Sequence, residues 1–303
     1  YPELHRRGVT VIRGDLTNAE AVKRACEGCA VVFHNAAKAG VWGDFDSFYR
    51  PNVIGTKNVI AACAGTGVGR LVFTSSASVV FSDADMAGVD ETVPYPEQPR
   101  SPYTATKAEA ERMVLAANGP VLKTLSLRPH LIWGPGDTQI VPRIIAQARA
   151  GKIVRVGDGR NVIDATYIDN AAAAHLLAAR ALADNPRAPG RAYFISNGEP
   201  VNLWDFVNRI LALAGLPPVR RGISKSVAVL LGTVVEKLHL TLRLSGEPRM
   251  TRFLAEELAT THWFDISAAR RELGYEPRVS MAEGLKRLQS WLIEGGGKPS
   301  YKG

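Results

Sequence analysis

Tyr103 and Lys107 are two residues whose types and spacing suit acid/base chemistry. They stand four positions apart in a stretch that begins at Ser101. On a helix, residues i and i+4 lie on one face, so the phenol and the ammonium can meet the same ligand. A free phenol titrates near ~10, and a neighbouring cation favours its ionised form, so Lys107 is placed to lower the pKa of Tyr103. An isolated pair of this kind is more often an ordinary surface pair, so its surroundings decide.

Those surroundings alternate between short apolar runs and amphipathic stretches. We expect strands over 9–13, 30–34, 70–74 and 124–129, and helices over 18–27, over 52–62 and around Tyr103. Short strands separated by helices imply right-handed crossovers and a parallel sheet that is covered on both faces. The pattern predicts an α/β fold with a Rossmann-type doubly wound parallel sheet. Ligands bind beyond the carboxyl ends of such strands, where Asp15, Ala36, Ala37, Ser75, Ser76 and Pro129 fall.

In this order and spacing, the chain resembles the extended short-chain dehydrogenase/reductases over nearly its whole length. The matching segments are 14–16, 34–37, 52–56, 73–77, the Tyr103 and Lys107 pair, 127–137 and 263–267. Segment 157–170, with the Ala-rich helix through His175, is most similar to the 3β-hydroxysteroid dehydrogenase group. That group includes sterol-4α-carboxylate 3-dehydrogenases and the bacterial 2-alkyl-3-oxoalkanoate reductases of olefin biosynthesis, and the loop 39–43 is most similar to the latter.

The resemblance implies catalytic roles. Tyr103 would exchange a proton with the substrate oxygen, and Lys107 would hold the cofactor ribose and lower the pKa of Tyr103. Ser76 would hydrogen-bond the same oxygen, with Ser75 as the second choice. His34 and His130 are interpreted as core or supporting histidines, because the Tyr–Lys pair leaves no acid/base task for them.

The resemblance also implies a set of cofactor-binding residues. Asp15 and Leu16 match a segment that contacts adenine, and Ala36, Ala37 and Lys38 match the loop beside the pyrophosphate and ribose. Asn52 matches a helix residue near the active site. Thr74 and Pro129 match positions whose backbone contacts the nicotinamide, and Tyr103 and Lys107 also belong to the set of cofactor-binding residues. Two alternatives stay open: Asp15 as a helix cap, and Asn52 as a group that only satisfies buried backbone.

The family opens with a strand, a Gly-rich turn, a helix and a second strand, yet no G-x-x-G-x-x-G occurs in this chain. Residue 1 is Tyr, so we expect roughly 30 residues, the size of a βαβ unit, to precede it in the intact protein. A strand at 9–13 would then lack its neighbour. The residues that distinguish NAD from NADP are expected in that unit, so the prediction of NADP, with NAD as the alternative, comes from the family alone.

We assign residues 1–185 to a dinucleotide-binding domain and 186–303 mainly to a smaller substrate-binding domain. The division follows a linker-like cluster at 185–190, and the second part is expected to form helices over 202–214, 268–273 and 280–293, with Ser267 and Ser280 as N-caps. The most apolar stretch is 227–235. It is interpreted as a buried helix or, because Lys225, Lys237 and Arg243 flank it, as a lid or membrane-facing helix that guides a lipid-like substrate.

Composition limits the classes of function. With 303 residues and 46% hydrophobic content, the chain can form a sizeable core, and it has no apolar run near the ~20 residues that span a bilayer. The charge of +8 is dispersed, apart from Arg220, Arg221 and Lys225, so it favours acidic ligands over nucleic acid. Three cysteines suggest a reducing, cytoplasmic location, and peripheral contact with a membrane is an alternative. The pair Cys26 and Cys29 is interpreted as incidental packing rather than as a metal site. A homodimer and an assembly with other olefin-pathway enzymes are both open.

Three functions remain. The first is an NAD(P)-dependent oxidoreductase that interconverts 3-oxo and 3-hydroxy groups on an apolar substrate, with reduction of 2-alkyl-3-oxoalkanoates preferred over 3β-hydroxysteroid or sterol-4-carboxylate oxidation. The second is a nucleotide-sugar epimerase or dehydratase. Against it, Ala77 and Ser78 stand where the dehydratases carry an acidic pair, and 130–133 lacks the epimerases' Asn. The third is a non-catalytic, cofactor-sensing regulator, a class that usually lacks the Tyr–Lys pair.

Overall fold

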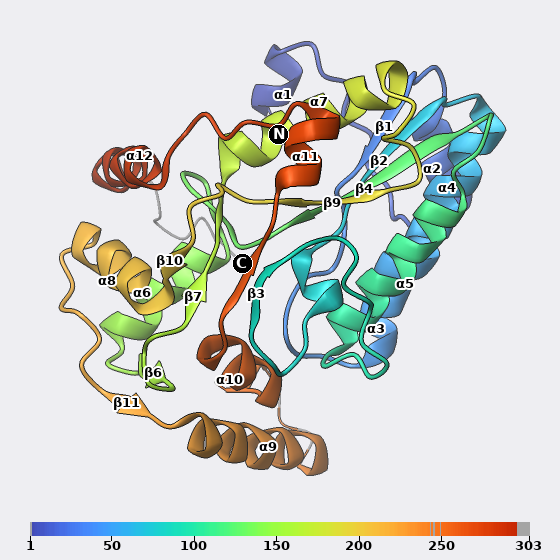
Figure 1. Ribbon diagram of the computed structural model, residues 1–303. Helices are drawn as coiled ribbons and strands as arrows, with labels where there is room; N and C mark the ends of the chain where they lie inside the picture. Colours follow the sequence, from blue (N-terminus) through green and yellow to red (C-terminus); the bar gives the residue numbers. More distant parts are fainter. Residues whose placement is uncertain (1, 243, 245, 249, 296–303) are drawn as a thin grey trace.

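The computed structural model describes residues 2–242, 244, 246–248 and 250–295. Its main sheet has four parallel strands in the order β1-β2-β4-β9 (Figure 1), namely β1 (Val31–His34), β2 (Arg70–Thr74), β4 (Lys123–Pro129) and β9 (Ala192–Ile195). This confirms the predicted α/β architecture. The expected strands at 30–34, 70–74 and 124–129 all form.

Helices cover both faces of this sheet because side chains alternate between its two sides. Leu71 and Phe73 of β2 pack on one side, and Val72 packs on the other. The first side is covered by α2 (Ala19–Cys26), α4 (Gly55–Thr66) and α5 (Pro102–Ala116), and the second by α7 (Ile168–Asp184) and α11 (Ser267–Leu273). Burial on both sides explains the apolar run at the centre of β2, Leu71 to Phe73.

The prediction of a strand at residues 9–13 is wrong. Residues 9–13 are extended but pair with no strand among the residues that the structure describes, and Val9 and Ile12 are 45% and 53% exposed. A strand needs a neighbour to bind its backbone groups, and none of the described segments supplies one here. β1 is therefore the outermost described strand, with Phe33 exposed at that edge.

A second unit is built from shorter strands. One mixed sheet has the order β10-β7-β12-β3, and two parallel pairs join β5 to β8 and β6 to β11. The strands are β3 (Met86–Val89), β5 (Ile132–Trp133), β6 (Arg155–Val156), β7 (Val162–Ile163), β8 (Thr166–Tyr167), β10 (Val201–Asn202), β11 (Gly222–Ile223) and β12 (His262–Phe264). Strands β5 to β8, between residues 132 and 167, belong to this unit, whereas β9 belongs to the main sheet. The chain thus passes between the two units more than once, and the domain boundary at residue 185 stays a prediction.

The helices of the second unit enclose a separate core around Trp133, Tyr167 and Phe206. They are α6 (Ile140–Arg149), α8 (Leu203–Leu213), α9 (Lys225–Thr241), α10 (Arg252–Ala259) and α12 (Met281–Ile293). The remaining helical elements are α1 (Pro2–Arg6), α3 (Phe45–Tyr49), the π-helix η1 (Arg50–Ile54) and the short 3₁₀ helix η2 (Ala77–Val80). Ser280 caps α12 as predicted, whereas Ser267 is the first residue of α11 and its N–H donates to Asp265, so its predicted role as N-cap is wrong.

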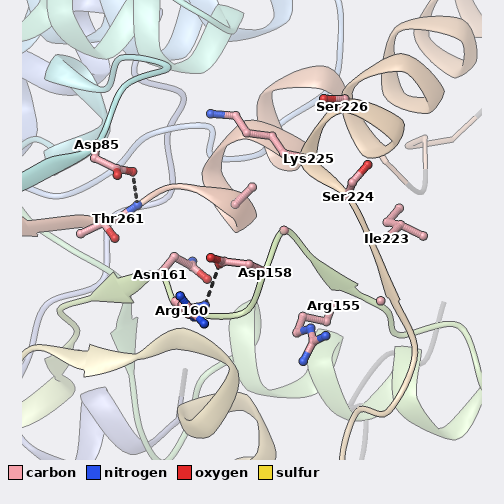
Figure 2. Close-up of a pocket in the computed structure, with 13 residues that line it drawn as sticks. Asp85, Arg155, Asp158, Arg160, Asn161, Ile223, Ser224, Lys225, Ser226 and Thr261 are labelled. Carbon is pink, nitrogen blue, oxygen red and sulfur yellow. Dashed lines mark hydrogen bonds between the residues drawn. The ribbon is translucent and has the colours of Figure 1, made fainter.

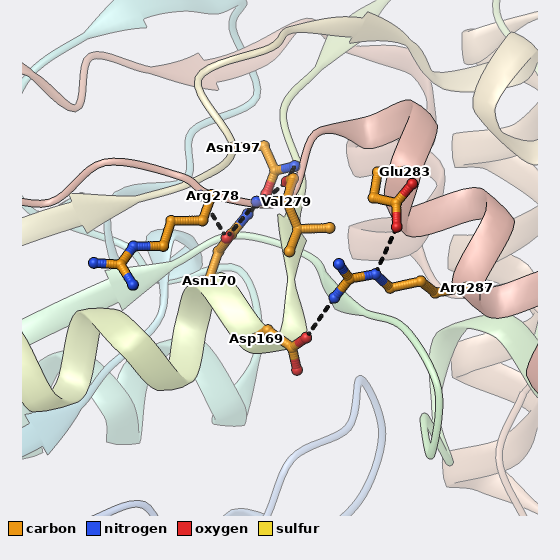
Figure 3. A network of polar contacts seen from close by, with 7 residues as sticks. All are labelled: Asp169, Asn170, Asn197, Arg278, Val279, Glu283 and Arg287. Atoms are coloured by element: carbon orange, nitrogen blue, oxygen red, sulfur yellow. Dashed lines mark hydrogen bonds and ion pairs between the residues drawn. The ribbon is translucent and has the colours of Figure 1, made fainter.

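A polar network fastens the start of α7 to the segment that leads into α12 (Figure 3). Asn170, which is 2% exposed, donates to Asn197 Oδ1 at 2.9 Å and to the Val279 carbonyl at 2.8 Å, and its own Oδ1 accepts the N–H groups of Arg278 and Val279. The side-chain amide of Asn170 thus has a partner on both its nitrogen and its oxygen. The network joins the two units close to the wall of the site described next.

Candidate active site

A cavity of about 480 Å³ lies at the carboxyl ends of β2 and β4. Its lining includes many of the residues expected from the sequence, namely Ala37, Thr74, Ser75, Ser76, Tyr103, Lys107 and Pro129. Tyr103 is held there because α5 begins just before it: Ser101 and Thr104 form a capping box, and Pro102 is the first residue of the helix. The structure therefore brings the predicted catalytic set into one place.

Lys107 is tied to the strand end rather than to solvent. Its Nζ donates a 2.6 Å hydrogen bond to the Thr74 carbonyl and lies 4.0 Å from the centroid of the Phe73 ring. The residue is 2% exposed, and burial lowers the pKa of Lys107 to about 7, although Glu111 opposes this shift. The ammonium is thus positioned by the protein itself.

Glu111 is a site-supporting residue that the sequence analysis did not single out. Its carboxylate forms an ion pair with the Arg128 guanidinium at 2.7 Å, and the two side chains are 0% and 4% exposed, respectively. The carboxylate also accepts hydrogen bonds from the hydroxyl groups of Ser126 and Tyr95. Burial opposes ionisation, yet Arg128 and these hydrogen bonds hold the pKa of Glu111 below its usual value. The sequence spacing could have indicated this role of Glu111, because Tyr103, Lys107 and Glu111 follow one another at intervals of four residues on α5.

The expectation that Lys107 lowers the pKa of Tyr103 does not describe this structure. Burial raises the pKa of the Tyr103 phenol, a hydrogen bond with Ser76 opposes the rise, and the carboxylate of Glu257 adds to it. The Lys107 ammonium donates to the Thr74 carbonyl, and no hydrogen bond between it and the Tyr103 phenol occurs among the described residues. Tyr103 is accordingly held in its protonated form.

Ser76 and Ser75 both line the cavity, but they differ in their partners. Ser76 Oγ accepts the N–H of Ser78 at 3.2 Å, lies 2.8 Å from Ser78 Oγ and is bonded to Tyr103. Ser75 is 4% exposed, and its Oγ has no hydrogen-bond partner among the described residues. Contact with Tyr103 favours Ser76, and the unpartnered hydroxyl of Ser75 keeps it as the second choice.

The segment expected to contact adenine borders a neighbouring pocket of about 240 Å³. Asp15, Leu16 and Ala36 line it, and Asn35 lines both this pocket and the catalytic cavity. The carboxylate of Asp15 accepts the N–H and the hydroxyl of Thr17, and these two bonds lower the pKa of Asp15. Because Asn18 is the N-cap of α2, the alternative of Asp15 as the helix cap is wrong.

Asn52 lies on the π-helix η1 and fixes the backbone of Lys38. Its Oδ1 accepts the Lys38 N–H at 2.7 Å, and its Nδ2 donates to the Lys38 carbonyl at 3.1 Å and to Thr106 Oγ1 at 3.0 Å. Asn52 therefore hydrogen-bonds backbone groups, which is one of the two roles considered from the sequence. The loop that it holds reaches the cavity through Ala37 and Ala39. The Lys38 ammonium is turned to Ser47 and lies over the Phe48 ring.

A contact through Thr74 connects the cavity to α7. Thr74 Oγ1 contacts Asn35 Oδ1 and lies 2.7 Å from Nε2 of His175, while Nδ1 of His175 donates to the Ala171 carbonyl. Burial lowers the pKa of His175, which favours its neutral ring. Asn35 and His175 were not assigned to the site from sequence, although both fall in segments that carried the resemblance.

His34 and His130 are buried, as the sequence interpretation predicted. His34 is bonded to Thr56, and burial, together with the charge of Lys107, lowers the pKa of His34 to about 3. His130 is bonded through Nδ1 to Asp164 at 2.6 Å. Neither residue is among those that line the catalytic cavity.

Part of the cavity lining is apolar. Leu131, Ile132, Trp133, Ile140 and Ile168 line it beside Gly134. Gly134 has φ 145°, and a Cβ there would lie 2.8 Å from a methyl carbon of Ile168, so the close approach needs glycine. Trp42 and the 227–235 stretch are absent from the lining of this cavity. The Trp42 ring contacts His239 of α9, with ring centroids 5.8 Å apart.

A more open hollow of about 780 Å³ lies in the second unit (Figure 2). Arg155, Arg160 and Lys225 border it together with Asp85 and Asp158. The two carboxylates accept backbone N–H groups from Thr261 and Arg160, respectively. None of the residues that line this hollow also lines the catalytic cavity, so it is a separate surface feature.

Comparison with known proteins places this geometry in a family. The model of the 3-beta hydroxysteroid dehydrogenase/isomerase family matches residues 3–222. The chain belongs to that family. It is 54% identical to a 2-alkyl-3-oxoalkanoate reductase of Stenotrophomonas maltophilia over 96% of this chain and 88% of the relative. It is 40% identical to a decarboxylating sterol-4-alpha-carboxylate 3-dehydrogenase of Schizosaccharomyces pombe, over 96% and 86%.

Solved structures share the fold of this chain. A protein crystallised with UDP-glucose and NAD superposes with a TM-score of 0.69 at 27% identity, covering 97% of this chain and 94% of that one. Membership of the 3-beta hydroxysteroid dehydrogenase/isomerase family makes the protein a Rossmann-type oxidoreductase of a nicotinamide-dependent family that acts on CH–OH groups.

Proposed function

We propose that the protein reduces the 3-oxo group of 2-alkyl-3-oxoalkanoates to the 3-hydroxy group. The 54% identical reductase supports this substrate class. The observation that carries the proposal is the composition of the cavity, where Tyr103, Ser76 and Lys107 face a wall that includes Leu131, Ile132 and Ile168. A polar reacting end beside an aliphatic wall suits an oxo group carried on an alkyl chain.

The residues of the chain fit a dinucleotide at two adjoining places. Asp15, Leu16 and Ala36 would hold the adenosine end, and Ala37, Thr74, Lys107 and Pro129 the nicotinamide end, with Asn35 between them. Lys38, which was expected beside the pyrophosphate and ribose, lines neither pocket. Asn52 would support this binding by fixing the Lys38 backbone. When bound, the dinucleotide supplies the hydride. We take NADP as the cofactor, with NAD as the alternative, from the family alone.

Tyr103 is the proton donor in this proposal. Its raised pKa keeps the phenol protonated, which suits an acid that gives its proton to the oxygen of a ketone as negative charge develops there. Ser76 would donate a hydrogen bond to the same oxygen, since its Oγ already accepts from Ser78 N–H and retains its own hydrogen. Lys107 would orient the ribose and offset the charge left on Tyr103.

A second candidate is oxidation of a sterol 4-carboxylate, which the 40% identical sterol dehydrogenase supports. Both substrates carry a 3-oxygen next to a carbon that bears a carboxylate, so the same Tyr103, Ser76 and Lys107 would serve. The two candidates differ in the shape that the aliphatic wall must accept.

The test is a series of 2-alkyl-3-oxo acids of increasing chain length, reduced with NADPH and with NADH. The corresponding 3-hydroxy acids, a 3β-hydroxysteroid and UDP-glucose are assayed in the oxidative direction with NADP⁺ and with NAD⁺. Each buried methylene adds about 0.8 kcal/mol of binding, so kcat/KM should rise up to fourfold per carbon until the cavity is filled. A flat profile, or turnover of the sugar nucleotide, would contradict the proposal. Preference for the steroid would support the second candidate.

A further inference from the structure

Helix α9 presents an outward row of aliphatic side chains that no described residue covers. Val227, Leu230, Leu231, Val234 and Leu238 are between 45% and 64% exposed, and they follow one another at helical spacing. The row continues beyond the helix with other exposed leucines. Eight of the eighteen exposed large hydrophobic side chains among the described residues fall between 227 and 244, so exposed apolar side chains are concentrated on this helix and the residues that follow it.

Another side of α9 packs against the rest of the protein. Ala228 and Gly232 are its buried residues, and α9 packs there against α10. A Cβ on Gly232 would lie 2.7 Å from the Thr251 carbonyl carbon, which shows how closely the two segments approach. In Figure 1, α9 lies at the lower edge of the molecule, with α10 above it and the main sheet farther away. The interpretation of 227–235 as a buried helix is therefore wrong, because only one side of it packs.

Basic residues border this surface. Arg220 and Arg221 are exposed just before β11, which leads into the helix, and Lys237 is exposed within the helix. Lys225 is the first residue of α9, and its ammonium donates to the Asp83 carbonyl at 3.1 Å. The acidic residue of α9, Glu236, is half-buried and accepts the Arg252 N–H at 2.8 Å. Figure 2 shows Lys225 at the start of the helix, near the hollow where Arg155 and Arg160 accompany Asp85 and Asp158. The border of the row thus has an excess of positive charge.

We propose that the outer face of α9 lies flat on an anionic phospholipid surface. The aliphatic row would enter the boundary between headgroups and acyl chains, and Arg220, Arg221, Lys225 and Lys237 would contact lipid phosphates. None of the described helices has the length and apolarity needed to cross a bilayer, so α9 would rest on the surface. A second copy of the chain is a poorer fit, because a two-fold interface on α9 would bring these cations together.

The same helix is connected to the active site. His239 of α9 contacts Trp42, and Trp42 belongs to the loop that contributes Ala39 to the catalytic cavity. Docking of α9 would therefore hold one border of the cavity near the lipid surface. The proposal itself rests on exposure and charge and does not depend on the substrate assigned above.

The test is sedimentation with vesicles of phosphatidylcholine, alone or with one third phosphatidylglycerol. The unaltered protein should bind the anionic vesicles, and 500 mM NaCl should weaken that binding. The double variant Leu230→Asp/Leu231→Asp should bind at least tenfold less. Leu176→Asp on α7, where the leucine is 68% exposed, is the matched control and should bind like the unaltered protein. Circular dichroism and thermal midpoints establish that each variant is folded.

A second pair of changes protects the test against a folding defect. Arg220→Glu/Arg221→Glu alters exposed side chains only and should reduce binding to anionic vesicles while leaving the thermal midpoint unchanged. Failure of the unaltered protein to bind anionic vesicles would overturn the proposal, as would equal binding by the leucine variant or equal loss in the Leu176 control. A dimer in light scattering that dissociates in the leucine variant, with no vesicle binding, would assign the face to a second copy instead.

Discussion

The ammonium group of Lys107 donates a 2.6 Å hydrogen bond to the carbonyl oxygen of Thr74, the last residue of β2. This bond joins the helix that carries Tyr103 to the end of a central strand. It also holds a charged group at 2% exposure, where desolvation is costly. Burial of this ionisable group therefore has a measurable pH signature.

Lys107→Met should change how stability depends on pH. Burial lowers the pKa of Lys107 from 10.5 to about 7, so between those values the unfolded chain binds more protons than the folded one. The contribution of Lys107 to the free energy of unfolding therefore rises as pH increases from 7 toward 10.5. The free energy of unfolding of the unaltered protein minus that of the variant should increase across pH 7 to 10 in urea titrations. A constant difference would show that folding does not lower the pKa of Lys107.

Tyr103→Phe should nearly abolish turnover while leaving cofactor affinity within a few fold. Only the transferable proton is lost, and general acid catalysis is worth about 10²–10⁴ in rate. Turnover and cofactor binding are measured on one preparation. Activity within a few fold of the unaltered enzyme would contradict the catalytic assignment.

Ser76→Ala and Ser75→Ala are a matched pair that should separate the two cavity hydroxyls. Loss of a hydrogen bond to the developing oxyanion costs about 10²–10³ in kcat, so Ser76→Ala should show that loss. Ser75→Ala should affect kcat less than tenfold, because Ser75 Oγ has no bond to Tyr103. The reverse order would transfer the role to Ser75.

Asn52→Ala should weaken cofactor binding and lower the free energy of unfolding by about 1–3 kcal/mol, since it leaves both backbone groups of Lys38 without their side-chain partner. Asn58→Ala removes one bond, to the Leu16 carbonyl, and is the comparison for a single loss. Calorimetry with the dinucleotide and urea unfolding report the two effects. Unchanged affinity in Asn52→Ala would limit this residue to a structural role.

Two adjacent residues of α7 should respond very differently to alanine (Figure 3). Asn170→Ala removes bonds to Asn197 and to the segment at 278–279 from a buried position, so it should cost about 2–4 kcal/mol of unfolding free energy. Asp169→Ala breaks an ion pair with Arg287 in which both side chains are about half exposed, and should cost less than about 1 kcal/mol. Similar losses in chemical denaturation would refute the difference.

Part of the site was predictable because its signals are local. The i+4 spacing of Tyr103 and Lys107, the apolar run before Ser75 and the Pro102 helix start each depend on residues near in sequence, and the structure shows them as expected. The strand at 9–13 failed for the opposite reason. Its apolar pattern is local, but a strand exists only where another segment completes its hydrogen bonds.

The sequence by itself determined the helix that presents Tyr103 and Lys107 on one face and the apolar strands of a parallel sheet. Only the tertiary structure decided what surrounds those residues: the Thr74 carbonyl that receives Lys107, the Arg128 guanidinium that neutralises Glu111, and the bare outer side of α9. Periodicity encodes which residues share a face, whereas burial and partner choice depend on segments that fold together from distant parts of the chain. The pKa of a buried group is set by those distant segments.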